Sequence, residues 1–175
     1  MTRAANMPPP ILEEWPAILL VRPQMGENIG AVARAMLNFG LTQLRLVEPR
    51  DRWPNSKAYA VASGADRVLD NAKLEWSLAP ALADATMVLA ATARPRELEK
   101  PVWGPSEAAE KLRAAIAAGE RPVILFGPER DGLTSDEVAR ADAILTHPVN
   151  PGFASLNLAQ AVCVFCYAYG EARIG

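Results

Sequence analysis

Short runs of apolar residues alternate along the chain with longer segments whose apolar residues recur every three to four positions. The continuous runs predict buried strands at Ala17–Val21, Gln43–Val47, Thr86–Ala90, Pro122–Phe126 and Asp142–Thr146. The helical spacing predicts helices over Asn28–Phe39, Ser56–Val61, Ser77–Ala83, Ser106–Ala118, Ser135–Ala141 and Leu156–Glu171. Apolar strands that alternate with helices are typical of a mostly parallel sheet covered on both faces. We therefore expect an α/β fold with three layers.

Signals at the helix ends agree with this pattern. Asn28 can cap the first helix, and Ser106, after a proline, opens the fourth. Gly40 and Gly119 stand where the first and fourth helices should end.

Length and composition limit the organisation of the chain. Its 175 residues, half of them hydrophobic and 22% charged, predict one domain over residues 1–175, with residues 1–14 loosely ordered. The longest apolar runs are shorter than the roughly 18–20 residues of a membrane span, and no charged and apolar leader opens the chain, so we expect a soluble cytoplasmic protein. A net charge of −2 argues against a general basic coat for nucleic acid but allows a local patch.

Cysteine and histidine are too few for a structural metal site. Cys163 and Cys166 share one face of the last predicted helix, and His147 is the only histidine, so the second ligand pair of a zinc site is missing. We expect no metal. Buried reduced thiols are favoured over a redox pair.

Candidate chemistry is sought in the loops that follow the strands, because ligands of an open parallel sheet lie beyond the carboxyl ends of its strands. In one such loop Gly26-Glu27-Asn28-Ile29-Gly30 leads into a helix that carries Arg34. The G-x-x-x-G spacing is not the dinucleotide fingerprint, although Glu48 falls where a ribose-binding acid would lie. Asn28 and Arg34 could reach one site, or they could be a helix cap and a solvated surface residue.

Two further loops combine glycine with polar groups. Leu125-Phe126-Gly127-Pro128-Glu129-Arg130-Asp131-Gly132-Leu133 follows one strand, and the segment from His147 to Ser155 follows the next and leads into Ser155-Leu156-Asn157. Ser155 is either a site residue or a helix cap. His147 precedes a proline and has no partner acid nearby, so a backbone contact to a ligand is favoured over proton transfer.

These three motifs together, N-x-G-x-x-x-R, F-G-P-E-x-x-G-L and S-L-N before an apolar helix, resemble the SPOUT superfamily in its TrmH-like (SpoU) branch. That branch contains S-adenosylmethionine-dependent RNA ribose 2′-O-methyltransferases. Ala35-Met36 and the segment AATARPR at Ala90–Arg96 are most similar to the TrmJ-type enzymes, which modify cytidine or uridine in the tRNA anticodon loop. TrmJ-type proteins usually continue past the point where this chain stops, at Gly175.

The resemblance implies a deep trefoil knot in the C-terminal part and a homodimer in which Asn28 and Arg34 of one subunit meet the cofactor of the other. It implies that S-adenosylmethionine is held by Ala91, Thr92, Ala93, Gly127, His147, Pro148, Ala154, Ser155 and Leu156. It implies catalytic roles for Arg34, Asn28, Glu129, Ser155 and Asn157. A guanidinium is not deprotonated in proteins, so Arg34 is not expected to act as a general base. We expect it to hold a phosphate and to stabilise the negative charge that develops on the ribose oxygen.

RNA binding by a neutral protein requires a local patch of arginines. Candidates on or beside strand-end loops are Arg22, Arg34, Arg50, Arg52, Arg94, Arg96 and Arg130. Three alternatives stay open: rRNA as the substrate, a catalytically silent module that binds RNA or cofactor, and a Rossmann-like nucleotide enzyme.

Overall fold

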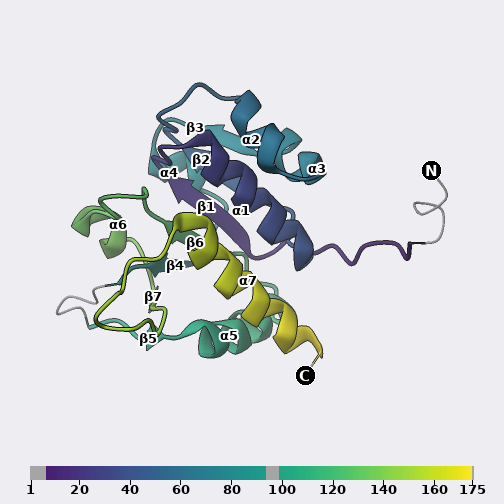
Figure 1. The fold of residues 1–175 in the computed structure, drawn as a ribbon. Helices are drawn as coiled ribbons and strands as arrows, with labels where there is room; N and C mark the ends of the chain where they lie inside the picture. The colour runs from purple at the N-terminus through teal and green to yellow at the C-terminus, as the bar shows by residue number, and fades with distance from the viewer. Residues whose placement is uncertain (1–6, 94–98, 175) are drawn as a thin grey trace.

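The computed structural model describes residues 7–93 and 99–174 and contains one parallel sheet in the order β3-β2-β1-β6-β4-β7-β5 (Figure 1). Every pair of neighbouring strands is parallel. The strands are β1 (Ala17–Val21), β2 (Leu44–Val47), β3 (Lys73–Glu75), β4 (Met87–Ala91), β5 (Val102–Trp103), β6 (Pro122–Phe126) and β7 (Ala143–Leu145).

Helices cover the two faces of the sheet unequally. They are α1 (Gly26–Asn38), α2 (Ser56–Val61), α3 (Asp66–Asp70), α4 (Leu78–Ala81), α5 (Pro105–Ala117), α6 (Ser135–Ala139) and α7 (Leu158–Ile174). One face carries the larger apolar core, in which α7 lies between α1 and α5 (Figure 1). The other face has a smaller core to which the short helices α4 and α6 contribute. The predicted three-layer α/β fold is thus observed with one thick and one thin outer layer.

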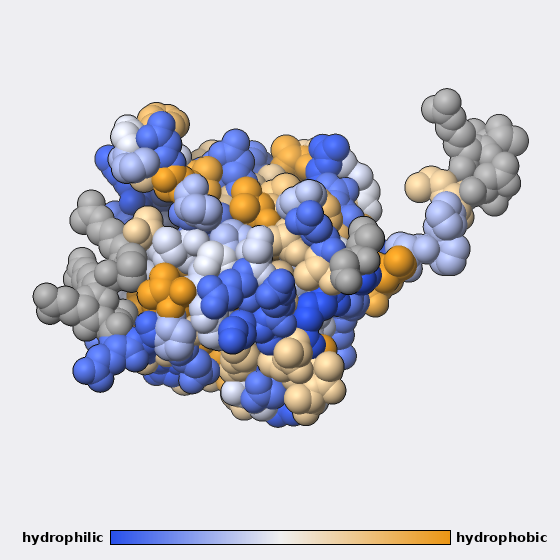
Figure 2. Space-filling view, turned by 90° about the horizontal axis from the view of Figure 1, so that it is seen from below, coloured by the Kyte–Doolittle hydropathy of each residue, from blue (hydrophilic) through white to orange (hydrophobic). Residues whose placement is uncertain are grey.

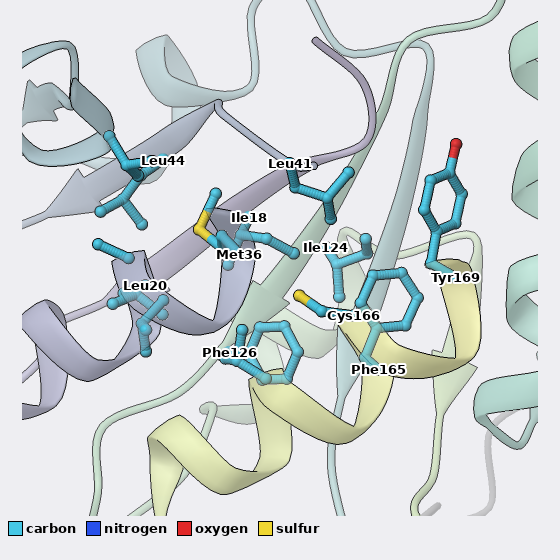
Figure 3. Packing of buried hydrophobic residues seen from close by; sticks show 14 of the residues in the cluster. Ile18, Leu20, Met36, Leu41, Leu44, Ile124, Phe126, Phe165, Cys166 and Tyr169 are labelled. Atoms are coloured by element: carbon cyan, nitrogen blue, oxygen red, sulfur yellow. The ribbon is translucent and has the colours of Figure 1, made fainter. Parts of the chain in front are cut away.

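The centre of the larger core is the contact between α7 and the sheet. Phe165 and Cys166 point from α7 toward Ile124 and Met36 (Figure 3), and the Tyr169 hydroxyl donates to the Trp15 carbonyl at 3.4 Å. Burial raises the pKa of the Cys166 thiol, and both cysteines are free. The expectation of buried, reduced thiols therefore holds for Cys166, while Cys163 is half-buried.

The predicted strands in the sheet centre are confirmed, β1 and β6 to the residue. The edge strands β3 and β5 and the short helix α3 were not predicted, because their short segments contain exposed or charged residues and no apolar run. Helix α1 begins at Gly26, and its N-cap is Met25, so the prediction that Asn28 caps this helix was wrong.

The N-terminal segment is anchored earlier than the predicted loose stretch of residues 1–14 implies. Residues 7–11 extend from the body (Figures 1 and 2), but the Glu13 amide donates to the Gly40 carbonyl at 2.7 Å. The Glu13 carboxylate accepts hydrogen bonds of 2.7 Å from both Arg113 and Arg173. Residues 1–6 lie outside the described part.

The surface of the molecule is polar over much of one face. Figure 2 shows hydrophilic side chains gathered in the middle of the face seen from below. Across the described residues, no helix combines the length and apolar character that crossing a bilayer requires.

Candidate active site

A cavity of about 770 Å³ opens at the carboxyl edge of the sheet, beyond β4, β6 and β7. Three segments line it: residues 91–93 from the last residue of β4 onward, residues 126–135 from the last residue of β6 onward, and parts of the chain from His147 to Ala161 after β7. This is the edge at which an open parallel sheet binds ligands, and the volume lies within the range of small-molecule sites.

The residues expected to hold the methyl donor gather around this cavity. Of the nine, eight line it: Ala91, Thr92, Ala93, Gly127, His147, Ala154, Ser155 and Leu156. Pro148 is not among the lining residues. Most of the eight have small side chains, which leaves backbone amides and carbonyls accessible to a ligand.

Gly127 is required by the fold of its own loop. A Cβ at this position would lie 2.4 Å from the Leu133 backbone nitrogen and 2.5 Å from the Gly132 carbonyl carbon. The loop after β6 therefore folds back onto Gly127, and Gly132 closes it at a φ of +69°. The glycines give the cavity wall its shape by allowing two backbone segments to touch.

Glu129 in this loop binds the start of α1. Its carboxylate accepts hydrogen bonds from the Gln24 amide at 2.8 Å, the Met25 amide at 2.9 Å and the Asn28 Nδ2 at 3.0 Å. Met25 provides no side-chain cap for α1, so a carboxylate 101 residues from Asn28 in sequence accepts hydrogen bonds from the amides at the helix start.

Asn28 extends this network to α7. Its Oδ1 accepts a hydrogen bond of 3.2 Å from the Asn157 Nδ2. The Oδ1 of Asn157 accepts from the Ala159 amide at 2.8 Å, so Asn157 caps α7 and the alternative that Ser155 is the cap was wrong. Asn28 is 9% exposed, and its amide is used within its own subunit.

Helix α6 forms another part of the cavity wall and is held from two sides. Arg22 forms a two-pronged ion pair with Glu137, which also closes a capping box with Thr134. Burial raises the pKa of Glu137, but the hydrogen bonds from Arg22 and Thr134 hold it below its ordinary value. Lys100 donates to the Val138, Ala139 and Ala141 carbonyls at the other end of α6.

His147 links the loop after β7 to α7. Its Nε2 lies 2.7 Å from the Ala161 carbonyl oxygen, which can only accept, so Nε2 carries a proton. Burial lowers the pKa of His147, and the ring is neutral at neutral pH. The His147 side chain thus connects the loop after β7 to the backbone of α7 through this hydrogen bond.

The glycines of the first motif serve helix packing. A Cβ at Gly30 would lie 2.0 Å from the Ala58 carbonyl oxygen of α2, and one at Gly26 would meet the Asn55 side chain. The G-x-x-x-G spacing thus brings α1 against α2, which gives no support to the dinucleotide alternative built on Glu48.

Arg34 is separate from this cavity. It is exposed on α1, does not line the cavity, and has no hydrogen bond or ion pair with any residue in the described ranges. Ser155 and Glu129 line the cavity, whereas Asn28 and Asn157 are not among its lining residues and are joined to each other and to Glu129 by hydrogen bonds. One subunit therefore brings together Asn28, Glu129, Ser155 and Asn157 but leaves Arg34 apart.

The predicted RNA-binding arginines differ in their availability. Arg130 and Arg52 are exposed, and Arg50 has a side chain 63% exposed with a 3.7 Å contact to Asp51. Arg22 is committed to Glu137, which sequence reasoning did not foresee because 115 residues separate them. Arg94 and Arg96 fall outside the described residues. Among the described residues, no cluster of His, Cys, Asp or Glu is arranged to hold a metal.

The family model of the SpoU rRNA Methylase family matches residues 16–167. The tRNA (cytidine/uridine-2′-O-)-methyltransferase TrmJ of Pectobacterium atrosepticum is 43% identical over 158 residues, which cover 90% of this chain and 63% of that protein. The chain spans 60% of a tRNA/rRNA methyltransferase from Haemophilus influenzae that is 39% identical. It therefore corresponds to less than two thirds of these relatives.

Solved structures share the fold. The crystal structure of TrmJ from Z. mobilis ZM4 superposes with a TM-score of 0.84 at 54% identity, covering 91% of this chain and 70% of that one. A structure described as giving insights into the 2-OH methylation of C/U34 on tRNA superposes with a TM-score of 0.73 at 28% identity, covering 91% and 96%.

Proposed function

The chain belongs to the SpoU rRNA methylase family, and on that premise we propose that it is a tRNA ribose 2′-O-methyltransferase acting on cytidine or uridine in the anticodon loop. S-adenosylmethionine is the proposed methyl donor, and the cytoplasm the proposed compartment. The observation that carries the proposal is the Asn28–Glu129–Asn157 network, which ties the three family motifs together behind one cavity. The tRNA (cytidine/uridine-2′-O-)-methyltransferase TrmJ of Pectobacterium atrosepticum, and the similar structure described as giving insights into the methylation of C/U34 on tRNA, support tRNA as the substrate.

The cavity fits a nucleoside-sized donor. Its volume of about 770 Å³ lies in the usual range for such ligands, and Ala91, Thr92 and Ala154 line it with small side chains beside a loop whose Gly127 has no space for a Cβ. In the proposal these residues and Ser155 hold the donor through backbone groups. When bound, the donor supplies a methyl group on a positively charged sulfur.

Arg34 is the proposed catalytic residue. Its guanidinium is exposed and unpaired within the described ranges, so it is available to a substrate phosphate and to the ribose oxygen as that oxygen gains negative charge. Asn28, Glu129 and Asn157 position the helix that carries it relative to the cavity. Ser155 and Glu129 both line the cavity, and because Glu129 is hydrogen-bonded to the start of α1, Ser155 is the residue proposed to contact donor or ribose.

Arg34 can join the cavity if it comes from a second copy of the chain, as a homodimer would allow. Helix α7 supports this proposal, since it buries one side in the core while Val164 and Tyr167 on another side stay 42% and 54% exposed. A helix that is apolar on more than its core side is suited to a further packing partner. We include in the proposal a deep trefoil knot formed by the chain around the cavity, which rests on family membership.

Methyl transfer tests the proposed function directly. The purified chain is incubated with radiolabelled S-adenosylmethionine and either tRNA or rRNA transcripts, and the modified nucleoside is mapped by mass spectrometry. We expect 2′-O-methylcytidine or 2′-O-methyluridine in the tRNA anticodon loop. Transfer to rRNA alone would replace the substrate assignment, and donor binding without any transfer would favour the silent module.

A further inference from the structure

Trp76 is the most exposed tryptophan in the described structure, with 68% of its surface accessible. It directly follows β3, so it lies at the same carboxyl edge of the sheet as the cavity. Strands β2 and β1 separate β3 from β6, which places Trp76 three strand spacings, roughly 14 Å, from the loop after β6. A nucleotide next to the target, and not the target itself, could therefore reach this side chain.

The loop after β2 lies between Trp76 and the loop after β1 along the sheet edge. Its Glu48 amide donates to the Glu75 carbonyl, the residue before Trp76, at 3.0 Å. Its Arg50 amide donates to the Pro23 carbonyl at 3.0 Å, in the loop that also reaches Glu129. These backbone bonds fix the loop that carries Arg50 and Arg52 beside both neighbours.

Positive and negative side chains are mixed along this edge. Asp51 lies 3.7 Å from Arg50, Glu48 is exposed, and the net charge of the chain is −2. Stacking on an aromatic ring contributes to RNA affinity independently of net charge, and it applies to single-stranded segments whose bases are free. An anticodon loop offers such bases.

Resting on the proposed function, we infer that Trp76 stacks on an unpaired base of the RNA substrate, with Arg50 and Arg52 contacting the phosphates between that base and the target ribose. The surface formed by Trp76, Arg50 and Arg52 thus extends the active site along the sheet edge.

The test measures RNA affinity separately from catalysis. Binding of a fluorescent tRNA transcript is followed by anisotropy for the wild type, Trp76→Ala, Trp76→Phe and the exposed apolar control Val61→Ala. We expect Trp76→Ala to weaken RNA binding about tenfold, with Trp76→Phe close to wild type and Val61→Ala unchanged. The KM for tRNA should rise with kcat and donor affinity unchanged.

Equal RNA affinity of Trp76→Ala and wild type, or equal losses in the Phe and Ala variants, would overturn the stacking role while leaving the proposed function intact. A wild-type protein that binds RNA through Trp76 but transfers no methyl group would overturn the proposed function and leave the stacking role intact. A wild type that does not bind RNA would overturn both.

Discussion

Asn28 on α1 and Asn157 at the start of α7 are joined by a 3.2 Å side-chain hydrogen bond across 129 residues of sequence. Because Glu129 binds Asn28 at the same time, hydrogen bonds connect the N-terminal ends of two helices and the loop after β6. Asn28, Glu129 and Asn157, which the motifs mark as catalytic candidates, thus hold together the segments around the cavity.

Replacing Glu129 should destabilise the protein. Glu129→Ala leaves the Gln24 and Met25 amides and the Asn28 side chain without their acceptor, and we expect a loss of about 1–3 kcal/mol in the free energy of unfolding. Urea denaturation measures this loss. Asp131→Ala, at an exposed position in the same loop, should stay within about 0.5 kcal/mol of wild type. Equal stabilities of the two variants would contradict the network's structural role.

A methyl group at position 127 should distort the cavity. Gly127→Ala places a Cβ against backbone atoms of the facing loop, and we expect a stability loss of about 1–3 kcal/mol together with weaker donor binding in calorimetry. Gly104→Ala is the matched control, because its nearest neighbour would lie 3.9 Å away. Normal donor affinity in Gly127→Ala would show that this loop does not contribute to the donor site.

Arg34→Ala should separate catalysis from folding. The side chain is exposed and unpaired within the described ranges, so stability and donor affinity should match wild type while methyl transfer falls about 10²-fold or more. Unchanged turnover would remove Arg34 from the catalytic proposal.

Mixed dimers can show which subunit supplies Arg34. Arg34→Ala is combined with Ala154→Phe, whose bulk would fill the cavity from an exposed position. If Arg34 acts across the interface, the mixed dimer regains one complete site and active enzyme reappears. Inactive mixed dimers would place Arg34 and the cavity in the same subunit.

A charge on the exposed side of α7 should block dimer formation. Val164→Glu introduces a carboxylate at a position 42% exposed in the single chain, and burial of that charge against a second copy is unfavourable. Light scattering should report a dimer for wild type and for Ala114→Glu, an exposed position on α5, but a monomer for Val164→Glu. A dimeric Val164→Glu would move the interface elsewhere.

Acid should weaken the anchor at Glu13. Burial raises the pKa of this carboxyl, but hydrogen bonds from Arg113 and Arg173 hold it below its ordinary value of 4.5. The ionised Glu13 carboxylate therefore contributes its full stabilisation above pH 4.5. This stabilisation is lost as the pH falls through the lowered pKa that Glu13 has in the folded protein. Wild type should lose more stability than Glu13→Gln between about pH 6 and about pH 3 in urea titrations. Parallel curves would exclude Glu13 as a source of acid sensitivity.

Features that depend on the local pattern of apolar residues could be predicted from the sequence. Strands β1 and β6 are buried at all five positions, so their apolar runs mark their ends well. The edge strand β3 has an exposed Lys73 and no such run, because only one neighbour and one face stabilise it. The start of α1 could not be read from Asn28, since the helix begins two residues earlier with Met25 as its N-cap, and Asn28 instead donates to Glu129, far away in sequence.

The position of α7 has a consequence for synthesis of the protein. This helix, formed by Leu158–Ile174, packs between α1 and α5, which come much earlier in the chain, and Arg173 reaches back to Glu13. The nascent polypeptide therefore cannot complete its main core until residue 174 has left the ribosome tunnel, and until then the part of α1 that contacts α7 stays uncovered.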